Sequence, residues 1–329
     1  MEPRKAGGSR LLVLVAFIAG LAACCTIASA AQSYPVRPIR IIVLSTPGTG
    51  PDIIARLIGA KLTEVWGQQV IVDDRAGASG IIGTEIAARS APDGYTLVTA
   101  TSQIVIVSGM YPNLKFDLIK DFAPVSLLGS TPFLLVVHPS VTANSVSELV
   151  ALAKAKPGAL HYGSGGAGSP IHLAAEIFKS MTGADIVHVP YKSSALALND
   201  TMGGQVQITF PVVPLGMPQI KAGRVRALGV TSSKRTALAP DLPTIAETVP
   251  GYEFIGWYSL LAPAKTPPEI VAKLNAEVVR SLSTPEFQER FTAIGAEAAG
   301  STPEQLAAYI RTEMEKMRRA IKLSGARPE

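Results

Sequence analysis

The sequence has only two cysteines in 329 residues, Cys24 and Cys25, and both lie near its start. The rest of the chain cannot form a disulfide framework, so its stability must come from a packed core. At this length, burial of roughly three quarters of the unfolded chain's surface is expected, and two domains are favoured over one.

Catalytic and metal-binding motifs are also missing. The sequence contains no GxSxG nucleophile elbow, no HExxH and no Gly-Lys-Ser/Thr phosphate loop. The four histidines have no metal-ligand spacing: His138, His161, His172 and His188. The sequence therefore predicts a protein that is not an enzyme and that needs neither a metal nor another cofactor.

Positive charge is modest and dispersed. The formal net charge is +5, and three of the bases, Arg4, Lys5 and Arg10, stand near the N-terminus. No Lys/Arg run of nucleic-acid type follows, and the C-terminal bases alternate with acids as on an ordinary solvated helix face. We therefore predict no nucleic-acid partner.

The first thirty residues have the pattern of an export signal. Bases precede an apolar run from Leu11 to about Cys25, and Ala28-Ser29-Ala30 supplies a small-residue cleavage site. This run is shorter than the roughly 20 residues that a transmembrane helix needs. We predict cleavage near Ala30, and a lipobox-like Leu21-Ala22-Ala23-Cys24 leaves a lipoprotein anchored through Cys24 as the alternative.

The remaining chain alternates short β-branched runs with amphipathic helical patterns, which is typical of α/β folds. The predicted strands of a first βαβαβ unit are residues 39–44, 70–72 and 95–100. A second unit of similar design follows from about Phe133. Three helices are predicted at the end of the chain, each opened by a proline after a threonine: 267–282, 285–294 and 303–321.

Two glycine-rich loops, PGTGPD at 47–52 and GSGGAGSP at 163–170, each follow a predicted strand and lead through a proline into an apolar helix. A helix start exposes unpaired N–H groups and a partial positive charge. Two such loops facing one cleft can therefore hold an anion without a charged side chain. A tight turn with a good helix cap is the simpler explanation of either loop alone, and that alternative stays open.

Other interpretations of these loops are weaker. The second loop satisfies the dinucleotide-binding pattern GxGxxG, but the strand after its helix ends in Val189-Pro190-Tyr191-Lys192, with no acid for a ribose. His172 and Glu176 lie one helical turn apart, and such a pair more often braces a helix than performs acid/base chemistry. His172 either borders the anion site or is packed and hydrogen-bonded to its own loop. Asp52 is most simply a first-turn acid favoured by the helix dipole.

Seven segments carry the motifs of a known family: YPVRPIRIIV, PGTGPDIIAR, VDDRAGASGIIGTEIAARSAPDGYTL, HYGSGGAGSPIHLAAEIFKSMTGADIVHVPYKSS, GGQVQITF, IKAGRVRALGVTSSKR and DLPTIAE. In order and spacing they resemble the Bug-type, or tripartite tricarboxylate transporter, solute receptors over about residues 34–326. The resemblance implies a periplasmic, two-lobed binding protein of type II, a Venus flytrap with a mostly parallel sheet flanked by helices in each lobe. We assign residues 1–30 to the signal peptide, 34–135 plus 250–329 to lobe 1 and 136–249 to lobe 2, with the ligand cleft between the lobes.

In that family the two loops grip one carboxylate of the ligand from opposite lobes, largely through backbone amides and ordered waters. The resemblance implies these ligand-binding residues: Ser45, Thr46, Pro47, Gly48, Thr49 and Asp52; Thr101 and Ser102; Ser164, Gly165, Gly166, Ala167, Gly168, Ser169 and His172; Tyr191 and Lys192; and, as a weaker candidate, Phe210.

The implied solute is small and carries a carboxylate: a dicarboxylate, an amino acid or an aromatic carboxylate. A monomeric receptor would deliver it to a membrane transporter, or would present its closed form to a membrane sensor. An exported enzyme acting on a carboxylate remains a less favoured alternative.

The chain departs from the family pattern at three positions. Ser45 replaces an aromatic residue that normally walls the pocket, Thr49 replaces the second glycine of a pair, and Ser193 stands where glycine commonly follows the lysine. Because threonine adopts a positive φ less easily than glycine, the backbone of the first loop is expected to differ. The identity of the ligand therefore does not follow from the resemblance.

Overall fold

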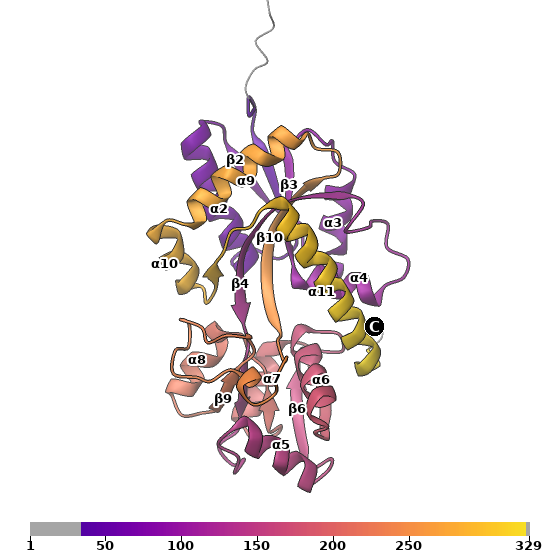
Figure 1. Ribbon diagram of the computed structural model, residues 1–329, viewed down its shortest axis with the longest axis vertical. Helices are drawn as coiled ribbons and strands as arrows, with labels where there is room; N and C mark the ends of the chain where they lie inside the picture. Colours follow the sequence, from indigo (N-terminus) through magenta and orange to yellow (C-terminus); the bar gives the residue numbers. More distant parts are fainter. Residues whose placement is uncertain (1–33, 327–329) are drawn as a thin grey trace, which may run out of the picture. The chain divides into compact units, whose positions relative to one another are not determined.

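A computed structural model describes residues 34–326 of the chain. These residues form two β-sheets, each flanked by helices (Figure 1). Both sheets belong to one compact unit that starts at Arg37. The predicted signal peptide, its cleavage site near Ala30 and the alternative anchor at Cys24 lie outside the described residues.

The first sheet has six strands in the order β11-β4-β10-β3-β1-β2. Their bounds are β1 Ile39–Val43, β2 Val70–Asp74, β3 Thr96–Thr101, β4 Phe122–Pro132, β10 Ile255–Pro263 and β11 Glu297–Ala298. β1 pairs in parallel with β2 and β3, whereas β10, β4 and β11 join through antiparallel pairs. β1 lies between β3 and β2 and is buried except at Arg40, whose guanidinium pairs with Asp73 on β2. Its other four residues are fully buried, as expected of a strand that is covered on both faces.

The helices of this half come from both ends of the chain. The N-terminal set is α2 Gly50–Trp66, the 3-10 turn η1 Ala78–Gly80, α3 Ile81–Ala88 and α4 Ser102–Met110. The C-terminal set is α9 Pro268–Leu282, α10 Pro285–Ala293 and α11 Pro303–Ser324. One predicted helix start is corrected: α9 begins at Pro268, because Pro267 is its N-cap and the Thr266 hydroxyl donates to the Pro263 carbonyl instead of capping the helix.

The second sheet has five strands in the order β7-β6-β8-β5-β9. Their bounds are β5 Leu134–Val137, β6 Leu160–Ser164, β7 Ile186–Pro190, β8 Ile208–Thr209 and β9 Arg226–Val230. The surrounding helices are α5 Val146–Ala155, α6 Pro170–Thr182, α7 Ser194–Met202, α8 Val213–Lys221 and the 3-10 turn η2 Ile245–Glu247.

The α/β class with two sheets is confirmed, but both sheets are mixed and not mostly parallel. Only the pairs formed by β1 with its neighbours and by β6 with its neighbours are parallel. The reason lies in how the chain passes between the sheets: the long strand β4 leads directly into β5, and the long strand β10 returns. β4 and β10 run antiparallel to each other.

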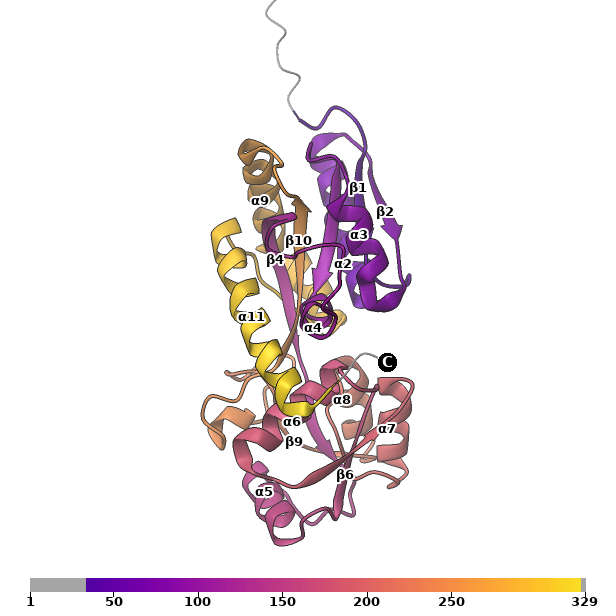
Figure 2. The ribbon, with the colours of Figure 1, turned by 90° about the vertical axis from the view of Figure 1, so that its right-hand side faces the viewer.

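Two aromatic residues pack together at the two crossings, the places where the chain passes between the sheets. The rings of Phe133, between β4 and β5, and Phe254, just before β10, meet edge to face with centroids 5.4 Å apart. Thr231, the residue after β9, bonds to both, because its Oγ1 accepts from the Phe133 N–H at 2.8 Å and its carbonyl accepts from the Phe254 N–H at 2.9 Å. The long helix α11 packs against α4 and α6, so it also links the two halves (Figure 2).

Candidate functional site

A cavity of about 230 Å³ lies between the second glycine loop and α4. One wall is the loop itself, Gly165 to Ser169, which joins β6 to α6. The opposite wall comes from the first-sheet half and consists of Ser79, Gln103, Val107, Met110 and Tyr111. The cavity therefore joins the two halves of the molecule, and no charged side chain of the described residues lines it.

The second loop turns sharply so that its backbone faces this cavity. Gly166 and Gly168 have positive φ values of 104° and 72°, which side-chain-bearing residues rarely adopt. Ser169 then caps α6 by accepting from the His172 N–H at 3.3 Å. The N–H groups of Gly165 and Ala167 have no hydrogen-bond partner among the described residues. Two free donors at the start of a helix form a suitable site for an anion.

His172 shapes this loop from behind. Its Nδ1 accepts from the Gly168 N–H at 2.9 Å, and the side chain is 4 % exposed. The alternative of a packed histidine bonded to its own loop is therefore the one that the structure contains. Burial lowers the pKa of His172, which keeps Nδ1 available as an acceptor.

A stack of rings continues behind His172. His188 stacks on His172 with centroids 4.2 Å apart, and Tyr162 stacks on His188 at 4.8 Å. His188 Nε2 lies 2.6 Å from the Ser164 hydroxyl, and burial lowers the pKa of His188 to about 4. Glu176 accepts from the Tyr162 hydroxyl at 2.7 Å and pairs with Lys179, so it braces the stack and makes no hydrogen bond with His172.

The first loop is closed on itself. The Ser45 hydroxyl lies 2.6 Å from Thr49 Oγ1, which donates to the Thr46 carbonyl at 2.7 Å. Two of the three departures from the family pattern, Ser45 and Thr49, are therefore partners of each other. Thr49 has an extended backbone with φ −82°, so it does not need the conformational freedom of glycine.

Asp52 braces the same loop. It accepts from the Gly48 N–H at 2.8 Å and pairs with Arg56 at 2.7 Å. Burial alone would raise the pKa of Asp52, but the hydrogen bonds from Arg56 and Gly48 outweigh it and leave the pKa lowered. A carboxylate committed to its own loop in this way is a structural group, which agrees with its simpler interpretation.

The structure does not place the first loop on the cavity. Its residues, Ser45, Thr46, Pro47, Gly48, Thr49 and Asp52, are absent from the cavity walls. The loop instead lies against β10, where a Cβ on Gly50 would come within 3.0 Å of the Tyr258 hydroxyl. Thr101 and Ser102 begin α4: Thr101 caps the helix by accepting from the Gln103 N–H at 3.3 Å, and Ser102 is buried.

The remaining predicted residues lie beside or behind the second loop. The Tyr191 N–H donates to the Ser164 carbonyl at 3.0 Å, and burial with a nearby Asp200 raises the pKa of Tyr191 to about 12. Lys192 is exposed. Phe210 is 1 % exposed and packs near Phe178 with ring centroids 6.3 Å apart, so it belongs to the core and does not line the cavity.

The prediction omitted the residues of the cavity wall opposite the second loop. Ser79 lies in a segment where Ala78 and Ser79 themselves have positive φ values of 45° and 53°. The flanking glycines of this segment were the only sequence signal for it. Nothing in the sequence singled out Gln103, Val107, Met110 or Tyr111.

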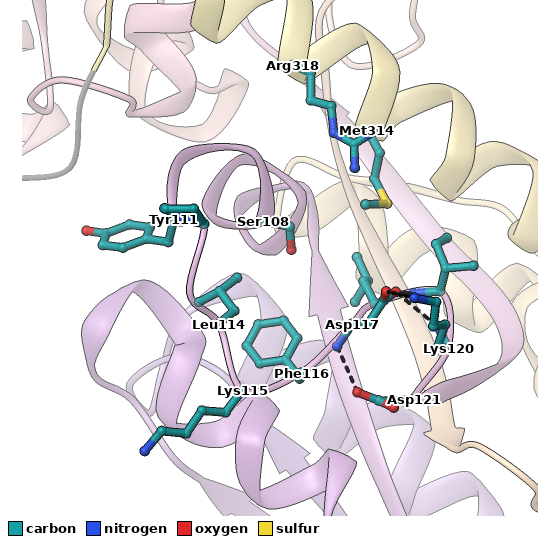
Figure 3. Close-up of a pocket in the computed structure, with 13 residues that line it drawn as sticks. Ser108, Tyr111, Leu114, Lys115, Phe116, Asp117, Lys120, Asp121, Met314 and Arg318 are labelled. Atoms are coloured by element: carbon teal, nitrogen blue, oxygen red, sulfur yellow. Dashed lines mark hydrogen bonds and ion pairs between the residues drawn. The ribbon is translucent and has the colours of Figure 1, made fainter.

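A second cavity of about 560 Å³ lies elsewhere, between α4, the segment 111–121 and α11 (Figure 3). Its segment is held by Asp117, which accepts from the N–H groups of Ile119 and Lys120, and by Asp121, which accepts from the Asp117 N–H. No residue predicted for the ligand lines it, and Tyr111 points its phenol away from the other labelled side chains.

Within residues 34–326, no group of three or more His, Cys, Asp or Glu side chains is arranged to hold a metal ion. Among the same residues no helix combines the length and apolar character needed to cross a bilayer.

The sequence matches the family model described as the tripartite tricarboxylate transporter family receptor over residues 54–326. The chain belongs to this family. The protein BugT of Bordetella pertussis is 36 % identical over 327 residues, which is 97 % of this chain and 98 % of BugT. The resemblance predicted from the sequence motifs is thereby confirmed.

Solved structures agree with this membership. A protein of R. palustris with adipate is 38 % identical, with a TM-score of 0.76 over 90 % of this chain and 100 % of that one. MatC of Rhodopseudomonas palustris, with bound malate, is 29 % identical, with a TM-score of 0.70 over 88 % and 100 %. The periplasmic binding protein BugD is 30 % identical, with a TM-score of 0.72 over 90 % and 100 %. The two-lobed fold of periplasmic solute-binding receptors is therefore that of this chain.

Proposed function

We propose that this receptor captures a small carboxylate-containing solute in the periplasm, between the second glycine loop and the α4 side of the first-sheet half. The observation that carries the proposal is the pair of free N–H groups, on Gly165 and Ala167, at a cavity walled from both halves. The adipate and malate in two related structures support a carboxylate as the ligand class. A dicarboxylate, an amino acid and an aromatic carboxylate all carry the group that these donors would bind.

The proposed lobes are residues 34–135 plus 250–329 and residues 136–249. The polypeptide passes between the sheets near Phe133 and Phe254, close to these proposed borders. Closure about the crossings would bring the first loop, Ser45 to Asp52, towards the second. The first loop would then contribute backbone N–H groups, since the Ser45 and Thr49 hydroxyls are engaged with each other.

Ligand binding is tested by thermal unfolding of the mature protein with a panel of carboxylates. A ligand at a hundred times its Kd stabilises the folded state by about 2.7 kcal/mol, which raises the melting temperature by several degrees. Native mass spectrometry of freshly purified protein would identify a retained solute. No shift across the panel, together with no retained carboxylate, would overturn the proposal.

We further propose that a monomer delivers the solute to a tripartite tricarboxylate-type transporter. A membrane sensor reading the closed form is the alternative, and a pull-down with liganded protein distinguishes the two. An exported enzyme is disfavoured because His172, Glu176 and Asp52 are all engaged in hydrogen bonds with neighbouring groups of the protein. Steady-state turnover of a bound carboxylate would reveal such an enzyme.

A further inference from the structure

The hydroxyl groups of the two glycine loops are not available to a ligand, because each already has a hydrogen-bond partner within the protein. The hydroxyls of Ser45 and Thr49 bond to each other, Ser164 bonds to His188 and to the second loop, and Ser169 caps α6. None of these four is free to select a ligand. The backbone of the second loop can hold a carboxylate, but it cannot identify the rest of the molecule.

Three side chains on the opposite wall remain free. Ser79, Gln103 and Tyr111 line the cavity, and the side-chain hydroxyl or amide of each lacks a hydrogen-bond partner among the described residues. They come from η1, from the first turn of α4 and from the residue that follows α4. All three therefore belong to the half of the molecule opposite the second loop.

Two apolar side chains share the wall opposite the loop. Val107 and Met110 line the cavity together with the three polar residues, and the loop approaches Met110 so closely that a Cβ on Gly168 would lie 2.3 Å from the methionine sulfur. The cavity thus offers backbone donors on the loop wall and, on the other wall, apolar side chains beside neutral side-chain donors. A ligand that matches all three has two polar ends joined by an aliphatic segment.

We infer that Gln103, Ser79 and Tyr111 determine specificity by donating hydrogen bonds to an oxygen at the end of the solute remote from its loop-bound carboxylate. This inference rests on the proposed function. The shared chemistry of the remote end is an oxygen acceptor, supplied by a second carboxylate or by an amide. An aliphatic monocarboxylate of the same length offers these three donors nothing, so its binding leaves them unsatisfied.

The experiment is isothermal titration of matched ligand pairs that differ only at the remote end. The pairs are succinate and butyrate, glutarate and pentanoate, and adipate and hexanoate, with adipamic acid as the amide probe at the last length. For the length that binds best, the wild-type protein should prefer the dicarboxylate to the monocarboxylate by about tenfold or more. Adipamic acid and adipate then separate an amide from a carboxylate as the preferred end.

Two variants test whether side chains of the wall opposite the second loop cause the preference for the dicarboxylate. Gln103→Leu and Ser79→Ala should each weaken the dicarboxylate several-fold while leaving the monocarboxylate nearly unchanged, so that the preference shrinks. A merely structural role would weaken both ligands of a pair equally. Gln69→Leu, at an exposed glutamine just before β2 and outside the cavity, is the matched control and should change neither.

The outcomes separate the two proposals. If no carboxylate of the broad panel binds and none is retained, both this inference and the proposed function fail. If carboxylates of another class bind but no member of these aliphatic pairs does, the inference is wrong and the proposed function stands. If both members of a pair bind equally, or if the preference survives Gln103→Leu and Ser79→Ala, the inference is wrong and the proposed function stands.

Discussion

At the scale of single residues, the site depends on groups that hold loops rather than on groups that touch a solute. His172 fixes the Gly168 N–H, Ser164 is held by His188, and Asp52 fixes Gly48. The sequence motifs pointed to His172, Ser164 and Asp52, but they could not distinguish a side chain that contacts a ligand from one that positions the backbone. That distinction depends on hydrogen-bond partners from distant segments, such as His188 for Ser164.

Gly168 provides the first prediction. Gly168→Ala places a side chain at φ 72° and a Cβ 2.3 Å from the Met110 sulfur, so it adds a steric conflict to backbone strain. Gly158→Ala, at φ 71° with open space around its Cβ, is the matched control for the strain alone. We expect a loss of about 1–2 kcal/mol for the control and a further 1–3 kcal/mol for Gly168→Ala. Urea unfolding measures both, and equal losses would contradict the close contact.

His188 provides a prediction about pH. Its folded-state pKa of about 4 lies below the ordinary value of 6.5, so the unfolded chain binds the proton more readily. The free energy of unfolding is therefore unaffected by this histidine above pH 6.5, and it decreases as the pH falls from 6.5 towards 4, where only the unfolded chain binds the proton. The melting temperature of the wild-type protein should decline across this window, and His188→Gln should flatten the decline. An unchanged slope in the variant would show that His188 is not a source of it.

At the scale of elements, the parallel strands and amphipathic helices were predictable and the buried or irregular ones were not. The α4 segment SQIVIVSGM is rich in β-branched residues and buried along its middle, so it has no amphipathic period to reveal a helix. β4 carries Pro124 and Pro132, which argue against a strand, and β10 is largely buried on both faces, so it shows no alternation of polar and apolar residues. The long antiparallel pair that makes both sheets mixed therefore stayed hidden in the sequence.

The N-cap of α4 provides a prediction about ligand affinity. Thr101→Ala removes the side-chain acceptor for the Gln103 N–H and should destabilise the protein by about 1 kcal/mol. Thr302→Ala removes the N-cap of α11, outside the cavity walls, at a similar cost. Titration with the best-binding carboxylate of the panel should show weaker binding for Thr101→Ala only, because the first turn of α4 carries Gln103. Equal affinities for the two variants would contradict a link between the N-cap of α4 and ligand binding.

At the scale of the whole molecule, the family and the two-sheet α/β fold followed from motif order, whereas the cavity did not. Its walls come from a loop after β6 and from residues at the end of the first-sheet half, and their meeting depends on how the crossings hold the two halves. The first loop, which the motifs place at the ligand, lies off this cavity.

Closure should therefore be visible as a change in the first loop. Hydrogen exchange of the mature protein should slow on ligand addition in peptides covering residues 44–52 as well as 163–172. The segment 112–121 lines the separate, larger cavity and serves as the internal control. Protection confined to the second loop would contradict a grip from two sides.

The close approach of Gly168 to Met110 also has a consequence for oxidative damage. Peroxide converts the Met110 thioether to a sulfoxide, which adds an oxygen to the sulfur where the loop leaves no room for one carbon. Oxidised protein should therefore lose affinity through a displaced loop and regain it when methionine sulfoxide reductase restores the thioether.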